Sequence, residues 1–581
     1  MGWRHHAGAS VFTGVGILIC VLPSEHASAQ EPSPDFIAEP APNDVELEDI
    51  DLFELEVPEV MIVTAGRRAQ RISQVPYAIG VVTADDIRRS GARSVPDALR
   101  LVPGIDIADL SYINSAVSTR GDHALLSNQV LVLVDGRQIF DSVFGGTVWG
   151  AWPFQLEDIA RIEVIRGPGG VTWGANAVNG VINIITKDPK DQLGLTFTGS
   201  GGSRGTHKEH LGYAFGDEKF RLRVSGEYEG SDGFRAVDPW IFQLEDDIQL
   251  GKAGVHAVYQ PTKNDTFTFS GGHGLSSGGR IAAIMSKGRR ETNPVTQASF
   301  LLGTWQHAIN DTDSFELTTY VNDDHGDMGH QVIQHRYQQI ALLASHRFAL
   351  GEAHTVTWGL DTRTDLIDTS NADPRLLSED YMSTAIIGVY AQDDWRFAPK
   401  WMLSLGARLD YEFYGGFQPS LRTSLSYELN DNAMLYGAVS RAFAMPPAAA
   451  RFLDAPVLGG LGRITANRDI DAQILWAYEL GYRAQFAHRF DVAANVYWHE
   501  FDNLTGLWSG LGPPGLMRIE YDNDGRASTY GFELDTKYRV TDTLTLLGHY
   551  THEQYDWRSA RHYHERGAIR APKHKFMIGA R

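Results

Sequence analysis

Three features of this 581-residue sequence are of the types that perform chemistry: clustered histidines, paired carboxylates and a glycine-rich turn. Three of the 21 histidines, His552, His562 and His564, lie close together near the C-terminus. Their spacing is not the spacing that zinc sites use. We therefore interpret them as solvated loop residues and predict no metal site.

Adjacent carboxylates occur at Asp246 and Asp247 and at Asp393 and Asp394, inside expected strands. Successive side chains of a strand point to opposite faces, so neither pair can work as a general acid and base. The glycine-rich residues 166–170 lack the Lys-Ser/Thr that follows a phosphate-binding loop, and we interpret them as a sharp chain reversal. Because no convergent Ser-His-acid set is visible, we expect no catalytic residues and no enzyme.

Charge and cysteine content exclude further classes of site. The net charge of −21 argues against nucleic-acid binding, which depends on Lys and Arg neutralising phosphates. The only cysteine, Cys20, lies in an N-terminal segment that we expect to be removed. A disulfide scaffold, a zinc-thiolate site and a thiol nucleophile are therefore excluded from the mature chain.

Residues 1–29 have the layout of a secretory signal peptide. Arg4 supplies a positive charge, residues 11–22 are apolar but too short to span a bilayer, and small residues precede a predicted cleavage site after Ala29. A lipid anchor on Cys20 is the alternative, but the large side chain before it does not fit a lipobox. The segment therefore predicts export.

Composition divides the rest of the chain into three parts. Residues 30–57 are acidic and Pro-rich, so we expect a disordered periplasmic linker. Residues 58–190 alternate helix and strand signals and predict a small α+β domain. Residues 191–581 contain strand after strand with alternating side chains, as in residues 220–228, joined alternately by short turns and long loops. This pattern is typical of a transmembrane β-barrel; a soluble β protein is the alternative, but no blade-length repeat is visible.

Local signals within residues 58–190 predict particular elements. Thr83 is expected to cap a helix, with Asp86 at the position of a capping box. Ser94, followed by a proline in the first turn, is expected to begin a second helix. Residues 130–134 form a continuous apolar run, which predicts a buried strand.

Four segments of this domain resemble the plug of the TonB-dependent outer-membrane receptors. They are residues 79–87 (IGVVTADDI), 98–105 (ALRLVPGI), 132–137 (VLVDGR) and 159–168 (IARIEVIRGP), the last continuing to residue 186. They stand in the order of the family, behind a signal peptide and before a barrel, and the resemblance covers essentially the whole mature chain. It implies a mainly β fold, a transmembrane antiparallel β-barrel with a small α+β plug domain in its lumen.

The resemblance also implies a plug–barrel lock, in which two plug arginines are held by two barrel glutamates. By motif, the arginines are Arg120 and Arg166 and the glutamates are Glu479 and Glu533. A guanidinium pairs bidentately with a carboxylate, and removing one partner leaves an uncompensated buried charge. Unrelated solvated charges are the alternative interpretation.

A TonB box is expected just before the plug. We assign it to Glu59, Val60, Met61, Ile62, Val63 and Thr64. This β-prone segment follows the acidic linker and is suited to strand addition with a periplasmic partner. The first strand of the plug is an equally open interpretation of the same residues.

The function implied by the resemblance is active import of a bulky, scarce nutrient across the outer membrane of a Gram-negative cell. An iron–siderophore complex is the expected cargo, with cobalamin, haem and oligosaccharide as alternatives. The expected partners are the TonB-ExbB-ExbD complex, outer-membrane lipid and an extracellular metal chelate; the receptor would be a monomer without a cofactor of its own. A passive pore or a surface-binding barrel is the alternative of another class.

The expected ligand surface is the upper plug together with the long loops. Its candidate residues are Tyr112, Asn114, Phe140, Phe144 and Trp149. Aromatic side chains there would stack on a siderophore or a corrin ring, whereas packing against the barrel wall is the alternative.

One departure from the family concerns strand number. Alternating segments number about 18, with uncertain boundaries, against the roughly 22 strands of the large outer-membrane transporters. The C-terminus also lacks the terminal aromatic residue of family members. We therefore expect a barrel that is truncated at its C-terminus by about four strands.

Overall fold

The computed structural model describes residues 61–109, 111–121, 128–150, 152–234, 244–281, 295–327, 334–372, 376–457, 462–487, 489–511, 517–558 and 572–581. The predicted signal peptide and linker lie outside these ranges, as do Glu59 and Val60 of the predicted TonB box.

The N-terminal domain is built on a five-stranded mixed sheet with the order β3-β8-β9-β6-β7. Its strands are β3 (Ala78–Thr83), β6 (Val130–Val134), β7 (Arg137–Gln138), β8 (Ile159–Arg166) and β9 (Gly180–Thr186). Strands β6 and β9 are parallel and the other pairs are antiparallel. Smaller elements are β1 (Met61–Ile62), β2 (Gln70–Arg71), β4 (Ile105–Asp109), β5 (Ser115–Thr119), and the 3-10 helices η1 (Ile72–Gln74), η2 (Leu156–Asp158) and η3 (Pro189–Gln192).

Side chains of the central strand β6 pack on both faces of this sheet. Val130, Val132 and Val134 lie in one buried apolar cluster, whereas Leu131 and Leu133 lie in a second cluster on the opposite face. Successive residues of a strand point to opposite faces, so a strand covered on both sides needs an unbroken apolar run. The buried strand predicted at residues 130–134 is thereby confirmed.

The predicted helix starts are confirmed as well. Helix α1 (Ala84–Ser90) begins with a capping box, in which Asp86 N donates to Thr83 Oγ1 at 3.2 Å and Thr83 N donates to Asp86 Oδ2 at 3.0 Å. Ser94 caps α2 (Val95–Leu99) through its side chain. The third plug helix is α3 (Gly170–Trp173). In the described part of the chain, no helix has both the length and the apolar composition that crossing a membrane requires.

The remaining strands form one large sheet in which neighbours along the chain pair antiparallel. Its wall consists of β10 (Gly194–Gly201), β11 (His207–Gly216), β12 (Phe220–Ser231), β13 (Leu244–Tyr259), β14 (Asp265–Ile281), β15 (Val295–Ala308), β16 (Ser314–Asp327), β17 (Gln334–Leu350), β18 (His354–Asp368), β19 (Tyr381–Ala398), β20 (Trp401–Glu412), β21 (Gly416–Asn430), β22 (Ala433–Ala444), β25 (Gln473–Phe486), β26 (Phe490–Leu511), β27 (Met517–Arg539), β28 (Thr545–Arg558) and β29 (His574–Ala580).

The loop between β22 and β25 carries its own elements. They are α4 (Ala448–Phe452), β23 (Asp454–Val457) and β24 (Gly462–Thr465). Because β22 pairs directly with β25, the β23–β24 hairpin stands outside the wall, and 18 of the 20 described strands of the sheet form the wall itself. This agrees with the strand number expected from the sequence. Within the described residues, β10 and β29 stand at the two ends of the strand order.

The wall has reversed polarity compared with a soluble protein. On β12, the charged residues Arg221, Glu227 and Glu229 are buried, whereas Val224 and Tyr228 are exposed on the outer face. An outward apolar face with a polar interior is the pattern of a transmembrane barrel and not of a soluble β protein.

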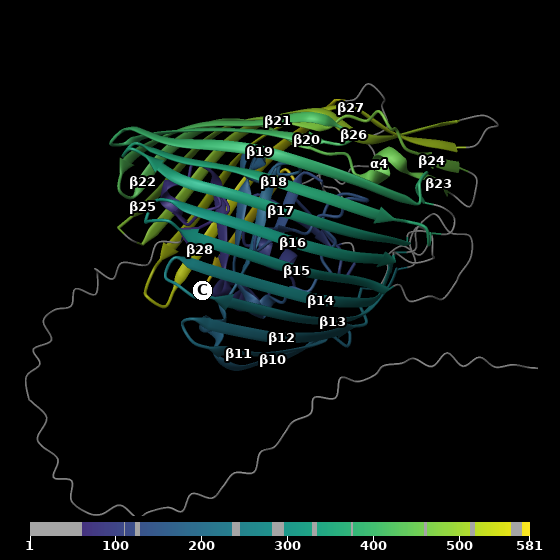
Figure 1. Ribbon diagram of the computed structural model, residues 1–581, viewed down its shortest axis with the longest axis horizontal. Coiled ribbons are helices and arrows are strands. Elements are labelled where there is room, and N and C mark those ends of the chain that lie inside the picture. Colours follow the sequence, from purple (N-terminus) through teal and green to yellow (C-terminus); the bar gives the residue numbers. More distant parts are fainter. Residues whose placement is uncertain are drawn as a thin grey trace, which may run out of the picture. The chain divides into compact units, whose positions relative to one another are not determined.

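The α+β domain occupies the interior of this wall. Its side chains and backbone hydrogen-bond to strands all around the sheet, among them β12, β16, β18, β21, β25 and β27. Figure 1 shows the long strands side by side, with the purple and dark-blue elements of the N-terminal domain behind the teal and green wall. We refer to this domain as the plug.

Candidate functional site

The four residues predicted to lock the plug to the wall lie together in the lumen. Arg120 Nε and Nη2 donate to the two oxygens of Glu533, both at 2.8 Å, and Arg120 Nη1 donates to Glu479 Oε1 at 2.6 Å. Arg166 Nη1 donates to Glu533 Oε2 at 2.8 Å. No side chain of the four is more than 5% exposed, so these are buried ion pairs and not solvated charges.

Local backbone geometry positions the two arginines. Arg120 follows β5 with φ of +51°, and Arg166 is the last residue of β8. Two glycines then allow the plug backbone to approach the glutamates. Gly104 has φ of +74°, and a Cβ there would lie 2.8 Å from Glu533 Oε1; Gly167 has φ of +110°, and its Cβ would collide with Glu479. Any other residue at these two positions would be strained and would displace a glutamate.

Burial and opposite charge act against each other in this network. Burial by itself lowers the pKa of Arg120, but the carboxylates of Glu533 and Glu479 more than offset it and raise that pKa above its ordinary value. The guanidinium therefore stays charged. Its Cζ also lies 4.3 Å from the centre of the Tyr497 ring, which adds a cation–π contact.

The network has a further member that the sequence did not reveal. Arg422, on β21, donates to Glu479 Oε2 at 3.3 Å and to the Pro76 carbonyl at 2.5 Å. Its Cζ lies 3.7 Å from the centre of the Tyr77 ring. Glu479 is thus shared between a plug arginine and a barrel arginine. A basic residue on an alternating strand carries no local signal that identifies its partner.

Residues 61–64 of the predicted TonB box are folded into the plug. Met61 and Ile62 form β1, which pairs with β2, and Ile62 is fully buried. Val63 N, Thr64 N and Thr64 Oγ1 all donate to Glu163 Oε2, at 2.9, 2.8 and 2.6 Å. Trp173 Nε1 donates to the Thr64 carbonyl at 2.8 Å. Met61 and Ile62 are thus the first described strand of the plug, and Val63 and Thr64 follow it. The assignment of the TonB box stays a prediction.

Two adjacent arginines tie the next turn of the chain to the wall. Arg67 donates to both oxygens of Asp361 on β18, at 2.9 and 2.7 Å, and Arg68 Nη2 donates to Asp394 on β19 at 2.5 Å. Arg408 also donates to Asp361, at 2.7 Å. The sequence did not predict the pairing of Arg67 with Asp361, because these residues meet only when the wall surrounds the plug. The N-terminal segment is therefore held at two places, by Glu163 inside the plug and by these carboxylates of the wall.

The five predicted ligand residues do not form one surface. Trp149 lies in the main apolar cluster of the plug and Phe140 in the second one, so both pack mainly within the plug and not against the barrel wall. Phe144 stands edge-on to the His335 ring, at 5.6 Å between centres. Asn114 Nδ2 donates to Ser111 within a local turn.

Tyr112 reaches the wall. Its hydroxyl donates to Glu229 Oε1 at 2.7 Å, and its backbone N–H donates to Asp246 at 2.8 Å. Burial, together with the carboxylate of Glu229, raises the pKa of Tyr112 to about 12. With Trp149 it borders a cavity of about 60 Å³ between the plug and strands β11 to β13.

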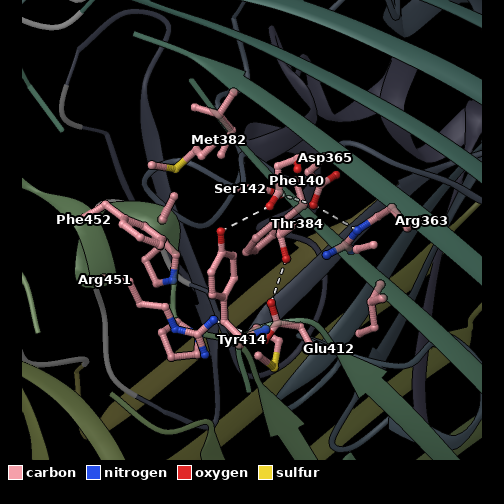
Figure 2. A pocket seen from close by; sticks show the side chains of 18 of the residues that line it. Phe140, Ser142, Arg363, Asp365, Met382, Thr384, Glu412, Tyr414, Arg451 and Phe452 are labelled. Atoms are coloured by element: carbon pink, nitrogen blue, oxygen red, sulfur yellow. Dashed lines mark hydrogen bonds and ion pairs between the residues drawn. The ribbon is translucent and has the colours of Figure 1, made fainter. Parts of the chain in front are cut away.

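A second cavity, of about 50 Å³, lies between the plug, strands β18 to β20 and the β22–β25 loop. Figure 2 shows its side chains converging from these elements: Phe140 and Ser142 from the plug, Arg363 and Asp365 from β18, Met382 and Thr384 from β19, Glu412 from β20, Tyr414 after it, and Arg451 and Phe452 from α4. Its lining residues Asp365 and Ile367 lie near the end of β18 (His354–Asp368), and Glu412 is the last residue of β20 (Trp401–Glu412).

The other candidate residues of the sequence have ordinary partners. Asp393 contacts His354 at 2.8 Å while Asp394 binds Arg68, so the two carboxylates point to opposite faces as predicted. His562 and His564 lie outside the described residues, and the His552 ring lies tilted against that of His574, at 4.8 Å between centres. Across the described ranges, no group of three metal-ligating side chains is found.

The sequence matches two protein families, each over one part of this fold. Residues 71–181 match the TonB-dependent receptor plug domain, and residues 173–581 match the β-barrel of the TonB-dependent receptor-like proteins. The second match alone covers more than half of the chain.

Individual relatives and solved structures agree with these matches. The chain is 25% identical over 546 residues to an iron-regulated outer membrane virulence protein of Vibrio cholerae, covering 89% of this chain and 81% of that protein. It is 26% identical over 474 residues to the vitamin B12 transporter BtuB of Vibrio vulnificus, covering 79% and 72%. The crystal structure of the siderophore receptor PirA from Acinetobacter baumannii superposes with a TM-score of 0.68 at 16% identity, over 83% of this chain and 81% of that one, and shows a shared fold.

Proposed function

Since this chain belongs to the TonB-dependent receptors of the outer membrane, we propose that it imports an iron–siderophore complex, driven from the inner membrane through the TonB-ExbB-ExbD complex. The energy source follows from the compartment, because an outer membrane holds neither ATP nor an ion gradient of its own. The family consists of receptors and transporters, not of enzymes.

The observation that carries this proposal is the buried ionic attachment of a plug that fills the lumen. Arg120 and Arg166 hold two carboxylates of the wall in an environment without solvent. Removing one partner of such a pair costs about 3–5 kcal/mol, so these pairs favour the closed position of the plug. This supports a transporter that needs an external force and argues against a passive pore.

The N-terminal segment is suited to receive that force. Met61 and Ile62 form the two-residue strand β1, which pairs with β2, and Val63 and Thr64 follow it. A pull on this segment acts first on the hydrogen bonds to Glu163 and then on the ion pairs of Arg67 and Arg68. In the proposed cycle these contacts break before the plug rearranges. The predicted TonB box is therefore bound to the plug at rest and becomes exposed only when it is released.

Cobalamin is the second candidate cargo, because vitamin B12 transporters are among the relatives. The deciding experiment measures uptake of labelled ferric chelates and labelled cyanocobalamin in cells that lack their own receptors. We expect ferric-chelate uptake that is abolished by deletion of tonB or by a protonophore. Uptake that survives loss of the proton-motive force would favour a passive pore. Uptake of cobalamin alone would show that the cargo is cobalamin and not a ferric chelate.

A further inference from the structure

Arg422 of β21 is in closer contact with the plug than with the carboxylate that it shares. Its Nη2 donates to the Pro76 carbonyl at 2.5 Å, and its Cζ lies over the Tyr77 ring, 3.7 Å from the ring centre. Its contact with Glu479 Oε2 is longer, at 3.3 Å, whereas Arg120 Nη1 reaches Glu479 Oε1 at 2.6 Å. Charge-assisted bonds between nitrogen and oxygen are normally about 2.7–2.9 Å long, so Arg422 is paired with Glu479 only weakly at rest.

The guanidinium of Arg422 also has a donor that is not used. The residue is 6% exposed, and its Nε has no hydrogen-bond partner among the described residues. A buried donor without an acceptor is unfavourable, and a guanidinium pairs most strongly with a carboxylate when two nitrogens face two oxygens. In the described part of the chain, Glu479 is the carboxylate with which Arg422 forms an ion pair. A closer pairing with Glu479 is therefore the favourable change for Arg422 once its contact with the plug is lost.

The plug residues that hold Arg422 lie on the path of the expected pull. Pro76 and Tyr77 stand between the N-terminal strand β1 and the sheet strand β3. The next residue, Ala78, is the register partner of Arg166 in the β3–β8 ladder. A chain that is pulled by its N-terminus is withdrawn in sequence order, so Pro76 leaves Arg422 before force reaches Arg166.

A second arginine of the wall holds the same plug segment. Arg483 of β25 donates to the Tyr77 carbonyl at 3.0 Å and to the Ile72 carbonyl. Residues 72–77 are thus bound to the wall by two arginines through backbone carbonyls. Of these two, Arg422 is the one with a printed bond to a carboxylate of the lock, Glu479.

We propose that Arg422 is a transfer residue of the lock: withdrawal of residues 72–77 frees it from Pro76, and it then takes over Glu479 from Arg120. The carboxylate stays paired with an arginine of the wall, so Arg120 leaves without exposing an uncompensated buried charge. A pull on the N-terminal segment is thereby converted into the weakening of one ion pair of the lock. The proposal rests on the proposed function, because it assigns one step of the same force-driven import.

The test pulls the purified full-length protein in a supported phospholipid bilayer, under constant force, by a handle at the N-terminus of its mature chain. The length of chain released at each step identifies two events, the withdrawal of residues 72–77 and the later release of Arg120. The variants are Arg422→Gln, Arg422→Met and Arg422→Lys. Arg483→Gln is the matched control, because Arg483 holds the same segment through the carbonyls of Ile72 and Tyr77.

Arg422→Gln should shorten the lifetime of the first event, because the Pro76 carbonyl loses its charged donor. It should lengthen the lifetime of the second event by about 10-fold or more, because no second arginine then competes with Arg120 for Glu479. Arg422→Lys keeps the charge and should restore part of the wild-type behaviour in the second event. Arg483→Gln should shorten the first lifetime and leave the second at its wild-type value.

A simple tether between wall and plug gives a different result. Its loss would make the second lifetime equal to that of the wild type or shorter, and this outcome in Arg422→Gln overturns the proposal. Arg422→Met carries the same expectations and can pack against the Tyr77 ring, so it decides the matter if Arg422→Gln does not fold.

Uptake in cells separates this proposal from the proposed function. Absence of TonB-dependent uptake of both ferric chelates and cyanocobalamin by the wild type would contradict the function itself. Where uptake depends on TonB, Arg422→Gln should lower its maximal rate about 10-fold and leave the affinity of the purified protein for the same probe unchanged. A maximal rate equal to that of the wild type would contradict only the transfer step.

Discussion

At the residue scale, Arg120 joins the plug to two strands of the wall. Three of its donor atoms reach two carboxylates from two different strands, and the residue adopts a left-handed backbone conformation to do so. Such a conformation is unfavourable for a residue with a Cβ, and it persists where surrounding contacts outweigh it. The buried pairs of Arg120 supply those contacts.

Replacing Glu533 by glutamine should loosen the plug. The substitution removes the charge that Arg120 and Arg166 share, and leaves Arg166 with the Pro103 carbonyl at 3.2 Å as its acceptor. Breaking one side of a buried pair costs about 3–5 kcal/mol. We expect cells that carry this variant to become sensitive to a large antibiotic that intact outer membranes exclude.

Glu428→Gln is the matched control for that experiment. Glu428 pairs with Arg396 at 3.1 Å on the exposed short-turn side of the wall, so its loss should leave antibiotic sensitivity unchanged. Wild-type sensitivity in Glu533→Gln would show that the ionic network does not hold the plug closed.

Strand β8 joins the two attachments at the scale of elements. Glu163 in its middle binds the N-terminal segment, and Arg166 at its end binds the wall. These residues are three positions apart and therefore lie on opposite faces of the strand. Displacement of the N-terminal segment thus acts on the same strand that carries the lock.

Glu163→Gln should release the N-terminal segment without opening the lumen. A glutamine offers one acceptor oxygen where three donors and Arg161 now converge on a carboxylate. Hydrogen exchange measured by mass spectrometry should become roughly 10-fold faster or more at the Val63 and Thr64 amides, because hydrogen bonds to a charged acceptor are lost.

Exchange in the rest of the plug sheet should stay at its wild-type rate in that variant. Asp85→Asn, which removes an exposed ion pair with Arg88 on α1, serves as the control and should leave the N-terminal amides unchanged. If Val63 and Thr64 exchange no faster in Glu163→Gln, the segment is held by other contacts than this carboxylate.

The whole molecule is organised by the inversion of polarity between its two faces. Large apolar side chains such as Leu301, Val389 and Leu480 point outward, and charged side chains point into a lumen that the plug fills. Burial of apolar side chains in lipid and pairing of charges around the plug together stabilise the wall.

A pair of matched arginine substitutions tests this arrangement. Leu301 is 70% exposed in the middle of β15, and Leu350 is 61% exposed at the end of β17. Leu301→Arg should lower the free energy of unfolding in phospholipid vesicles by about 2–4 kcal/mol, and Leu350→Arg by about 0–1, because the cost of a charge falls from the bilayer midplane to its interface. Urea titration provides the measurement, and equal costs at the two positions would contradict a lipid-facing band.

The elements of this protein were predictable because their signals are local. The capping box at Thr83, the apolar run of β6 and the alternation on β12 each depend on residues a few positions apart. The number of wall strands follows from counting such segments. The lock residues were identified as well, although through their resemblance to family motifs and not through any local physical signal.

Tertiary structure alone decided which of these residues meet. Arg120 and Glu533 are separated by 413 positions, and Arg67 and Asp361 by 294, so their contact depends on the wall surrounding the plug. The same closure placed residues 61–64 in the plug and brought Arg422 to Glu479. The sequence by itself therefore determined the strands, the plug and the family, because periodicity and turn chemistry act over short distances. The partners of each charge were decided only when distant strands packed around a common interior.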